Sequence, residues 1–300
     1  MAQIKRILKN WVIPPGYFNI IKGHQNRKKS ATPQEVLNSA LEIKNKKNTH
    51  KDEKCFILAT GPSINSMDLS PLEERNCISV SHFYLHKLAS IIKPAYHVLA
   101  PYHPPFDFDS LKKIFDGLAS TYNHSIQYFF GYQNYEYSIY NFFEQYKEYK
   151  KLFTYSFINY SESEPLNDKN YMQKNIWDIS LNPFLIRTVI YEAIQIAFYL
   201  GFKKIYLLGC DHNYLWIRNY KNEIKDHHFY KEAQGSGEKE YQHLNSFTTE
   251  RWFAEYYERW KQYRLIKEYL LANNVSVINL TPNSMLDVFP SEDFESIIHE

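Results

Sequence analysis

Three short polar stretches of this sequence contain side chains that could carry out chemistry. Thr60-Gly61-Pro62-Ser63, Ser81-His82 and Gly209-Cys210-Asp211 each follow an apolar run. The missing side chain of a glycine lets a ligand approach the backbone closely, and Ser63 is expected to open a helix whose N–H groups suit a phosphate. Histidine and aspartate can act in acid–base chemistry or as metal ligands. The pattern predicts a nucleotide site.

Each stretch also has a purely structural interpretation. Gly61 and Pro62 end a strand and Ser63 caps a helix, whether or not a ligand binds. A lone His82 beside aromatic residues is more often a packed, hydrogen-bonded residue than a catalyst. Asp211 could contact a metal, a ribose or an acceptor, but no third metal ligand stands near it in the sequence. The dinucleotide fingerprint, the P-loop, the serine-hydrolase elbow and the zinc motif His-Glu-x-x-His do not occur.

A fourth stretch, 226–230, contains two adjacent histidines, His227 and His228, within a polar, Tyr-rich and His-rich segment at about 213–247. Histidine titrates near neutral pH, which suits a general base. Adjacent side chains of an extended segment point in different directions, so at most one of the two is expected to be catalytic. Because the segment directly follows a predicted strand, we expect it to form a lid over the site rather than an unrelated surface insertion.

The pattern of apolar runs predicts the scaffold that positions these stretches. Strands are predicted near 55–59, 77–81, 96–100, 126–130, 152–155, 204–208 and 275–280. Helices are predicted over 32–47 with Thr32 as cap, over 183–200 ending at Gly201, and over 249–273. This alternation predicts an α/β fold: a Rossmann-like, mostly parallel sheet with helices on both faces. Such sheets bind ligands beyond the carboxyl ends of their strands, where the polar stretches fall.

Composition narrows the class of protein. The 300 residues are 44% hydrophobic and 23% charged with a net charge of +2, which fits a globular domain and gives no reason to expect a nucleic-acid partner. The three cysteines lie in apolar runs without metal-ligand spacing, so reduced core cysteines in a cytoplasmic protein are expected. We expect neither a signal peptide nor a membrane-spanning segment.

The first 34 residues carry basic side chains and no acidic one, and Ile4, Ile7, Leu8 and Trp11 recur at helical spacing. Such a basic amphipathic helix could attach the protein peripherally to the inner membrane, or it could dock on its own core or on a partner. We therefore divide the chain into a basic N-terminal arm and helix (1–50) and a single Rossmann-like domain (51–300).

Five motifs, taken in order along the chain, resemble those of the bacterial sialyltransferases of glycosyltransferase family 42. They resemble more closely a broad bacterial family of the same fold that is labelled by its likeness to archaeal 6-hydroxymethylpterin diphosphokinase. The motifs lie at 56–63, 80–84, 200–211, 228–230 and 281–286. The resemblance to the sialyltransferases implies a single domain with a lid, a CMP-sugar donor, and neither a metal nor another cofactor.

The resemblance also implies roles for single residues. Ser81 stands where the sialyltransferases carry an asparagine that contacts the donor, and their catalytic histidine falls on His228, with His227 as the alternative. Their two lid tyrosines, which steady the leaving phosphate, fall on Tyr214 and Tyr220. The candidate nucleotide-binding residues are Thr60, Gly61, Pro62, Ser63, Ser81, His82, Thr188, Gly209 and Asp211.

One motif departs from the sialyltransferase pattern. Their Thr-Ser-Gly turn, near the donor, reads Arg187-Thr188-Val189-Ile190 in this chain. Donor contacts around Thr188 must therefore differ. Arg187 could meet a phosphate or a sugar carboxylate, or it could lie at the surface at a helix start.

These features predict a glycosyltransferase of polysaccharide or lipopolysaccharide biosynthesis. It would move a sugar from a nucleotide-activated donor, such as a CMP-linked acidic sugar, to a cell-surface glycan or lipid-linked acceptor. His228 would deprotonate the acceptor hydroxyl, while the Gly61 loop and Tyr214 would hold the nucleotide. One alternative is an ATP- and Mg²⁺-dependent diphosphotransferase of the pterin type, with Asp211 as its one well-placed carboxylate. A second is a non-catalytic binding protein on the same fold.

Overall fold

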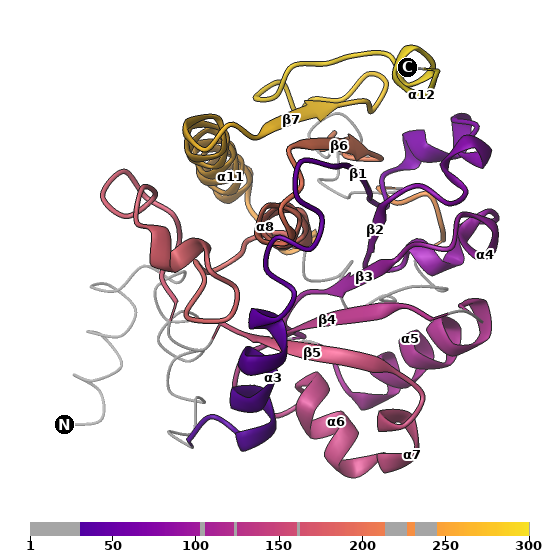
Figure 1. Cartoon of the computed structure of the whole chain (residues 1–300), viewed down its shortest axis with the longest axis vertical. Coiled ribbons are helices and arrows are strands. Elements are labelled where there is room, and N and C mark those ends of the chain that lie inside the picture. The colour runs from indigo at the N-terminus through magenta and orange to yellow at the C-terminus, as the bar shows by residue number, and fades with distance from the viewer. Residues whose placement is uncertain are drawn as a thin grey trace.

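Seven parallel strands form one sheet in the order β5-β4-β3-β2-β1-β6-β7 (Figure 1). The computed structural model describes residues 31–102, 106–122, 125–160, 163–213, 227–231 and 245–299. The predicted α/β, Rossmann-like fold is confirmed, and each predicted strand is present within a few residues of its expected bounds. The strands are β1 (Lys54–Leu58), β2 (Cys77–Val80), β3 (Tyr96–Leu99), β4 (Gln127–Tyr132), β5 (Thr154–Asn159), β6 (Lys204–Leu208) and β7 (Ser276–Asn279).

The central strands read as continuous apolar runs because both faces of the sheet are covered. Along β1, Cys55 and Ile57 enter the core on one face, and Phe56 and Leu58 enter the core on the other. Helices α8 (Val189–Leu200) and α11 (Thr249–Ala272) pack on the first face. On the second face lie α4 (Ala89–Ile92), α5 (Phe108–Thr121), α6 (Ile139–Gln145), α7 (Lys147–Lys150) and α12 (Phe294–Ile298).

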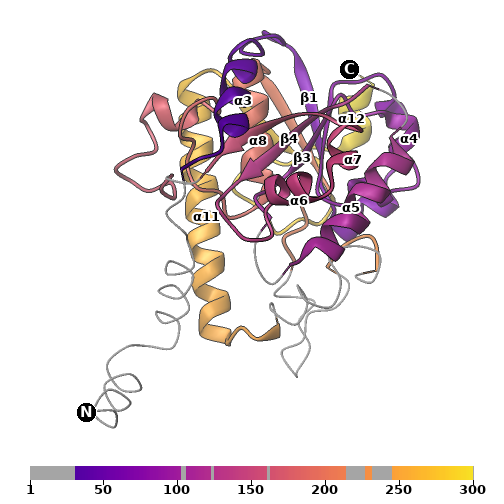
Figure 2. The same ribbon diagram turned by 90° about the horizontal axis from the view of Figure 1, so that it is seen from below.

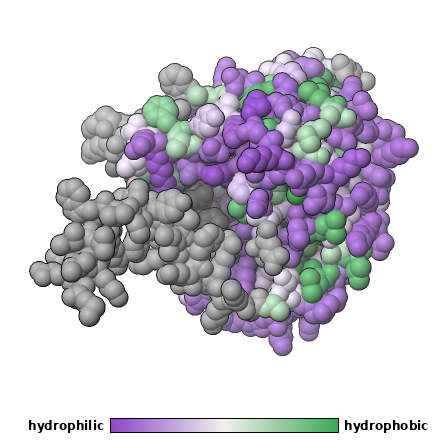
Figure 3. Space-filling model, turned by 90° about the vertical axis from the view of Figure 1, so that its left-hand side faces the viewer, coloured by the Kyte–Doolittle hydropathy of each residue, from purple (hydrophilic) through white to green (hydrophobic). Residues whose placement is uncertain are grey.

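The helix α3 (Gln34–Lys44) packs against β5 at one edge of the sheet. In Figure 2, α11 runs past the layer of the sheet, and its first turns project beyond it. The side of the molecule drawn in Figure 3 is mostly hydrophilic, with apolar residues scattered over it, because the large apolar side chains are inside. The three cysteines, Cys55, Cys77 and Cys210, are buried and free, as predicted.

Two of the predicted helices have wrong bounds, and the one expected over 32–47 also ends early, at Lys44. The helix expected over 183–200 begins at Val189, because the backbone of Thr188 is extended and its Oγ1 accepts a hydrogen bond from the Ile190 N–H. The helix expected over 32–47 begins at Gln34 with Pro33, not Thr32, in the cap position, and no side chain caps it. The end of α8 at Gly201 is as predicted, with a φ of 102° that favours glycine.

The order of the strands reverses between β1 and β6. From β1 the sheet grows through β2 to β5 on one side, and β6 and β7 are added on the other. The loops that follow β1 and β6 therefore leave in opposite directions and open a crevice at the carboxyl ends of these strands. This is the edge at which the sequence places its polar stretches.

The N-terminal arm is predicted over 1–50, and its amphipathic helix, which could bind a membrane or dock on the core or a partner, lies in residues 1–30, outside the described residues. No helix within the described ranges has both the length and the hydropathy needed to cross a bilayer.

Glu192 of α8 is fully buried, and its carboxyl oxygens have no hydrogen-bond partner within the described part of the chain. Burial raises the pKa of Glu192 well above its ordinary value, and the nearby Tyr160 phenol opposes this shift. The folded chain therefore keeps a proton that the unfolded chain releases, so the stabilisation from this proton is lost as the pH rises toward the raised pKa.

We expect Glu192→Gln to remove this pH dependence. Relative to the variant, the wild type should lose up to about 1.4 kcal/mol of unfolding free energy for each pH unit above the ordinary carboxyl range. Urea unfolding of both proteins at pH 5, 6, 7 and 8 measures the difference, with the exposed Glu148→Gln as the matched control. A constant difference between wild type and Glu192→Gln across this range would contradict the assignment.

Candidate functional site

A cavity of about 540 Å³ opens at the carboxyl ends of the central strands, where the strand order reverses. This volume falls in the range of small-molecule sites. Pro62 and Ser63 do not line the cavity, and Tyr214 and Tyr220 lie outside the described residues. The predicted site residues that do line it are Thr60, Gly61, Ser81, His82, Thr188, Gly209, Asp211 and His228.

The Asp211 carboxylate joins the loop after β6 to the loop after β1. It accepts hydrogen bonds from the Ser63 N–H (3.1 Å) and from the Ser63 hydroxyl (2.8 Å). Burial raises the pKa of Asp211, and the two bonds from Ser63 oppose this. A Cβ at Gly61 would lie 1.9 Å from Asp211 Oδ2 and 2.5 Å from the Gly209 carbonyl oxygen. Glycine is therefore needed at 61 for the approach of Asp211 and Gly209.

The expectation that Ser63 opens a phosphate-binding helix is wrong. Gly61 stands in the cap position, and Ser63 lies inside a short 3₁₀ turn, η1 (Pro62–Ser66), without capping it. The Ser63 N–H donates to the protein's own carboxylate. A turn of this length offers no helix dipole of consequence, and the Ser63 N–H is already used by Asp211.

Strained backbone marks the ends of β2 and β6. Ser81 has a φ of 50° and His212 a φ of 49°, in the left-handed region that residues other than glycine rarely adopt. Gly209 shares this region, with a φ of 71°. All three residues line the cavity, and such strain is found preferentially at functional sites.

The segment expected to form a lid, 213–247, is described only at 213, 227–231 and 245–247. Its middle part is bound to the loop after β1. The Phe229 N–H donates to the Thr60 carbonyl (2.9 Å), and the Asn65 side chain donates to the Phe229 carbonyl (3.0 Å). The Phe229 ring packs edge-on against His86, with ring centroids 5.3 Å apart. These contacts hold His228 at the wall of the cavity.

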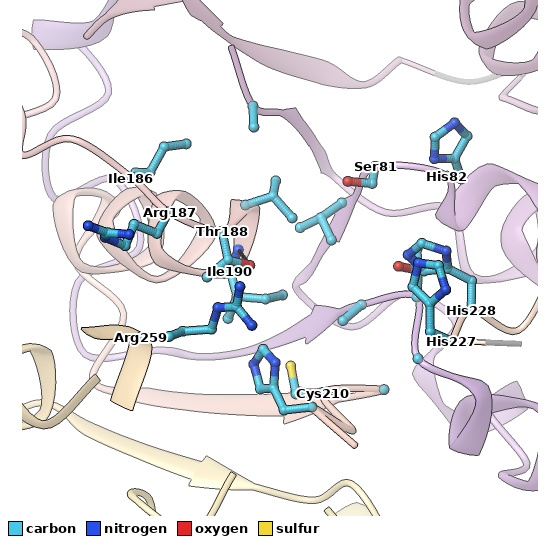
Figure 4. A pocket seen from close by; sticks show the side chains of 18 of the residues that line it. Ser81, His82, Ile186, Arg187, Thr188, Ile190, Cys210, His227, His228 and Arg259 are labelled. Atoms are coloured by element: carbon cyan, nitrogen blue, oxygen red, sulfur yellow. Dashed lines mark hydrogen bonds between the residues drawn. The ribbon is translucent and has the colours of Figure 1, made fainter. Parts of the chain in front are cut away.

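His228 is half-buried, whereas His227 is buried at 3% exposure. The His228 imidazole lies parallel to the Tyr230 ring, with centroids 4.8 Å apart and an interplanar angle of 8°. The Tyr230 hydroxyl is hydrogen-bonded to His82 Nδ1 at 3.1 Å. In Figure 4, His82, His227 and His228 lie on the opposite side of the cavity from Arg187 and Arg259.

His82 is buried and uncharged. Burial lowers the pKa of His82 to about 3, with smaller contributions from His228 and His97. An imidazole with this pKa is uncharged near neutral pH and is a weak base. Of the two histidines in the expected nucleotide and catalytic sets, His228 alone is both half-exposed and accessible from the cavity.

Arginines of α11 line the cavity, although none was predicted as a site residue. Arg251, Glu255 and Arg259 recur every four residues, which places them on one face of the helix, and all three line the cavity. This spacing was the available signal. The Arg187 guanidinium pairs with the Glu255 carboxylate at 3.0 Å, and the Arg251 guanidinium lies 3.6 Å from the centroid of the Phe247 ring. Figure 4 shows Arg259 pointing into the cavity.

The aspartate and histidine after β6 point to different partners. Asp211 accepts from Ser63, and His212 Nε2 is hydrogen-bonded to the Tyr263 hydroxyl at 2.7 Å. Burial, with a smaller contribution from Arg259, lowers the pKa of His212 to about 3. Across the described ranges, no group of three or more His, Cys, Asp or Glu side chains is placed to hold a metal ion.

No family model and no curated protein sequence matches this chain. Among solved structures, it is similar to the sialyltransferase CstII from Campylobacter jejuni in complex with cytidine-5′-monophosphate (16% identity; 80% of this chain and 85% of that chain; TM-score 0.45). It is also similar to CstII in complex with a trisaccharide acceptor and CMP (17%; 80% and 85%; 0.43). A third similar structure is the monofunctional α-2,3-sialyltransferase Cst-I from the same organism (17%; 80% and 80%; 0.43). The sequence motifs described above resemble those of sialyltransferases, which is the class of enzyme named for these three structures.

We expect the contact between Ser63 and Asp211 to stabilise the fold. Ser63→Ala should cost about 1.5–3 kcal/mol, as expected for a hydrogen bond to a charged group. Because the two residues share one contact, Ser63→Ala and Asp211→Ala should be non-additive by about 0.5–3 kcal/mol in urea unfolding.

The matched control is the pair Asp107 and Ser110 at the start of α5. There, one carboxylate likewise accepts from a serine N–H (3.1 Å) and hydroxyl (2.9 Å), but the pair joins residues of one helix start. The coupling energy between Asp107 and Ser110 should be smaller than that between Ser63 and Asp211. Additive effects at 63 and 211 would refute a structural role for this contact.

Proposed function

We propose that this protein is a glycosyltransferase that takes a sugar from a nucleotide-activated donor, with a CMP-linked acidic sugar as the favoured donor. The acceptor is a hydroxyl of a glycan or glycolipid. The observation that carries the proposal is the position of the half-buried His228 imidazole. It lies in a nucleotide-sized cavity at the point where the strand order reverses, across from arginines of the opposite wall.

The charges that line the cavity suit an anionic donor. Arg187, Arg251 and Arg259 supply positive charge, and the described lining includes two carboxylates, Asp211 and Glu255. Each carboxylate has a protein partner, Ser63 for the first and Arg187 for the second. Because Arg187 is paired with Glu255, the positive charge that a nucleoside phosphate meets comes mainly from Arg251 and Arg259, and no carboxylate of the described lining is left unpaired to repel it. The motif resemblance favours CMP as the nucleotide.

His228 is the proposed general base. As the acceptor oxygen bonds to the anomeric carbon of the donor sugar, its proton passes to the imidazole, and the bond from that carbon to the phosphate oxygen breaks. The nucleotide leaves with the electron pair, and its phosphate charge is stabilised by the arginine wall. His227 is less suited to this role because it is almost fully buried.

The proposed reaction needs no metal, because the arginines balance the charge of the leaving phosphate. The diphosphotransferase alternative requires carboxylates that hold Mg²⁺. Its best candidate, Asp211, is engaged by two hydrogen bonds from Ser63, so this alternative is less favoured. Peripheral attachment to a membrane through residues 1–30 stays a prediction.

We expect CMP to stabilise the protein in a thermal-shift panel of CMP, CDP, UDP, GDP and ATP, each with and without Mg²⁺. A ligand present at 100 times its dissociation constant adds about 2.7 kcal/mol to the free energy of unfolding. The shift with CMP should be the same in the presence of Mg²⁺ and of a chelator. A shift with ATP alone, and only when Mg²⁺ is present, would favour the diphosphotransferase instead.

We expect His228→Gln to lower turnover by about 10²–10⁴-fold, the usual contribution of a general base, while CMP affinity changes little. The assay follows CMP released from a CMP-linked sialic acid in the presence of short oligosaccharide acceptors. His50→Gln, at the opposite end of the sheet, is the matched control. Near-wild-type turnover in His228→Gln, or a larger loss in His227→Gln, would refute the assignment of the base.

A further inference from the structure

Three side chains form a chain of contacts that begins at His228 and ends inside the core. The His228 ring is stacked on Tyr230, and the Tyr230 hydroxyl is hydrogen-bonded to His82. Tyr230 is 8% exposed and His82 is 5% exposed, so both are held by their surroundings. Only His228 reaches the cavity with a half-exposed side chain.

The far end of this chain of contacts is firmly placed. His82 comes directly after the strained Ser81, and its carbonyl accepts from the Leu85 N–H (3.0 Å) at the start of the turn η3 (Phe83–Leu85). The His82 ring also packs against Tyr230, with centroids 5.1 Å apart. Its position is therefore set by the end of β2 rather than by the segment that carries His228.

The two ends are also tied through the backbone. Phe229, which lies between His228 and Tyr230, is hydrogen-bonded to Thr60 and to Asn65 in the loop after β1. The main chain on the carboxyl side of His228 is thus fixed, and rotation of its side chain is limited by the rings that pack against it. A parallel ring at 4.8 Å restricts that rotation, because turning the imidazole out of plane loses the stack.

We infer that Tyr230 is a positioning residue, which holds the plane of the His228 imidazole by stacking on it and is itself anchored by His82. The inference rests on the proposed function for its consequence, because an oriented base matters only if His228 takes the acceptor proton. The orientation itself is a property of the free protein. A base that loses its alignment can cost about 10²-fold in rate even though its chemistry is unchanged.

Nuclear magnetic resonance of the free protein with ¹³C-labelled histidine tests the stack directly. The His228 Cε1–H signal is assigned by its disappearance in His228→Gln. In the wild type this signal should show the upfield shift that an aromatic ring imposes on a proton above its face. Tyr230→Leu should lose that shift, whereas Tyr230→Phe, which keeps the ring but loses its anchor on His82, should lose only part of it.

Tyr230→Phe guards against the possibility that the leucine variant does not fold. It removes only the hydroxyl bonded to His82, so its His228 signal should broaden or move part of the way. Tyr155→Phe is the matched control, because it also removes a tyrosine hydroxyl contact, here the part-buried one to Glu35 at the far edge of the sheet. An unchanged His228 signal in a folded Tyr230→Leu, or in Tyr230→Phe if the leucine variant is unfolded, would overturn the inference.

Turnover of the CMP-linked sialic acid separates positioning from simple support of the fold. At saturating donor, kcat of Tyr230→Leu should fall about 10–100-fold, with KM within about twofold of the wild type. A rise of about 10–100-fold in KM, with kcat retained, would overturn the positioning role of Tyr230. If His228→Gln keeps full turnover, the proposed base fails, and the resonance experiment still decides whether Tyr230 orders the ring.

Discussion

The contact between Asp211 and Ser63 is the interaction on which the site depends. Two loops leave β1 and β6 in opposite directions, and the carboxylate of one accepts both donors of Ser63 in the other. Glycine at 61 is what lets them approach so closely. The same loop after β1 provides the Thr60 carbonyl that binds the backbone of Phe229. The position of His228 is therefore linked, through Phe229 and Thr60, to the contact between Asp211 and Ser63, which joins the loops after β6 and β1.

Strands and the place of the site could be predicted from the sequence because the central strands are buried on both faces. A strand such as β1 must then be apolar at every position, and the polar residues that follow it must lie at its carboxyl end. Helix starts were less predictable. Thr188 and Pro33 occupy the cap positions because of the local backbone geometry. The periodicity of apolar residues in the sequence does not indicate that geometry.

The role of a residue was harder to predict than its position in the fold. Gly61 stands where a nucleotide-binding glycine was expected, yet its missing side chain makes room for Asp211. Arg259 lies about 50 residues from the polar stretch after β6, on a helix that reads from its sequence as a mixed surface helix. Only the packing of α11 beside the strand ends brings its arginines to the cavity. The spacing of Arg251, Glu255 and Arg259 indicates that they share one face of a helix, but it does not indicate that this face meets the strand ends.

The division of charge between the two walls gives the site its chemical character. One wall carries guanidinium groups, and the other carries histidines, of which the buried His82 is neutral. A neutral His82 is hydrogen-bonded to Tyr230 without placing a positive charge beside His228. Such a site can bind an anionic leaving group on one side and accept a proton on the other.

The most direct test of this account is a crystal structure of the protein with CMP bound. We expect CMP to lie in the cavity between the loops after β1 and β6, with its phosphate facing the arginine wall and His228 on the opposite side. CMP bound elsewhere on the protein, or a phosphate turned away from Arg187 and Arg259, would contradict the central claim.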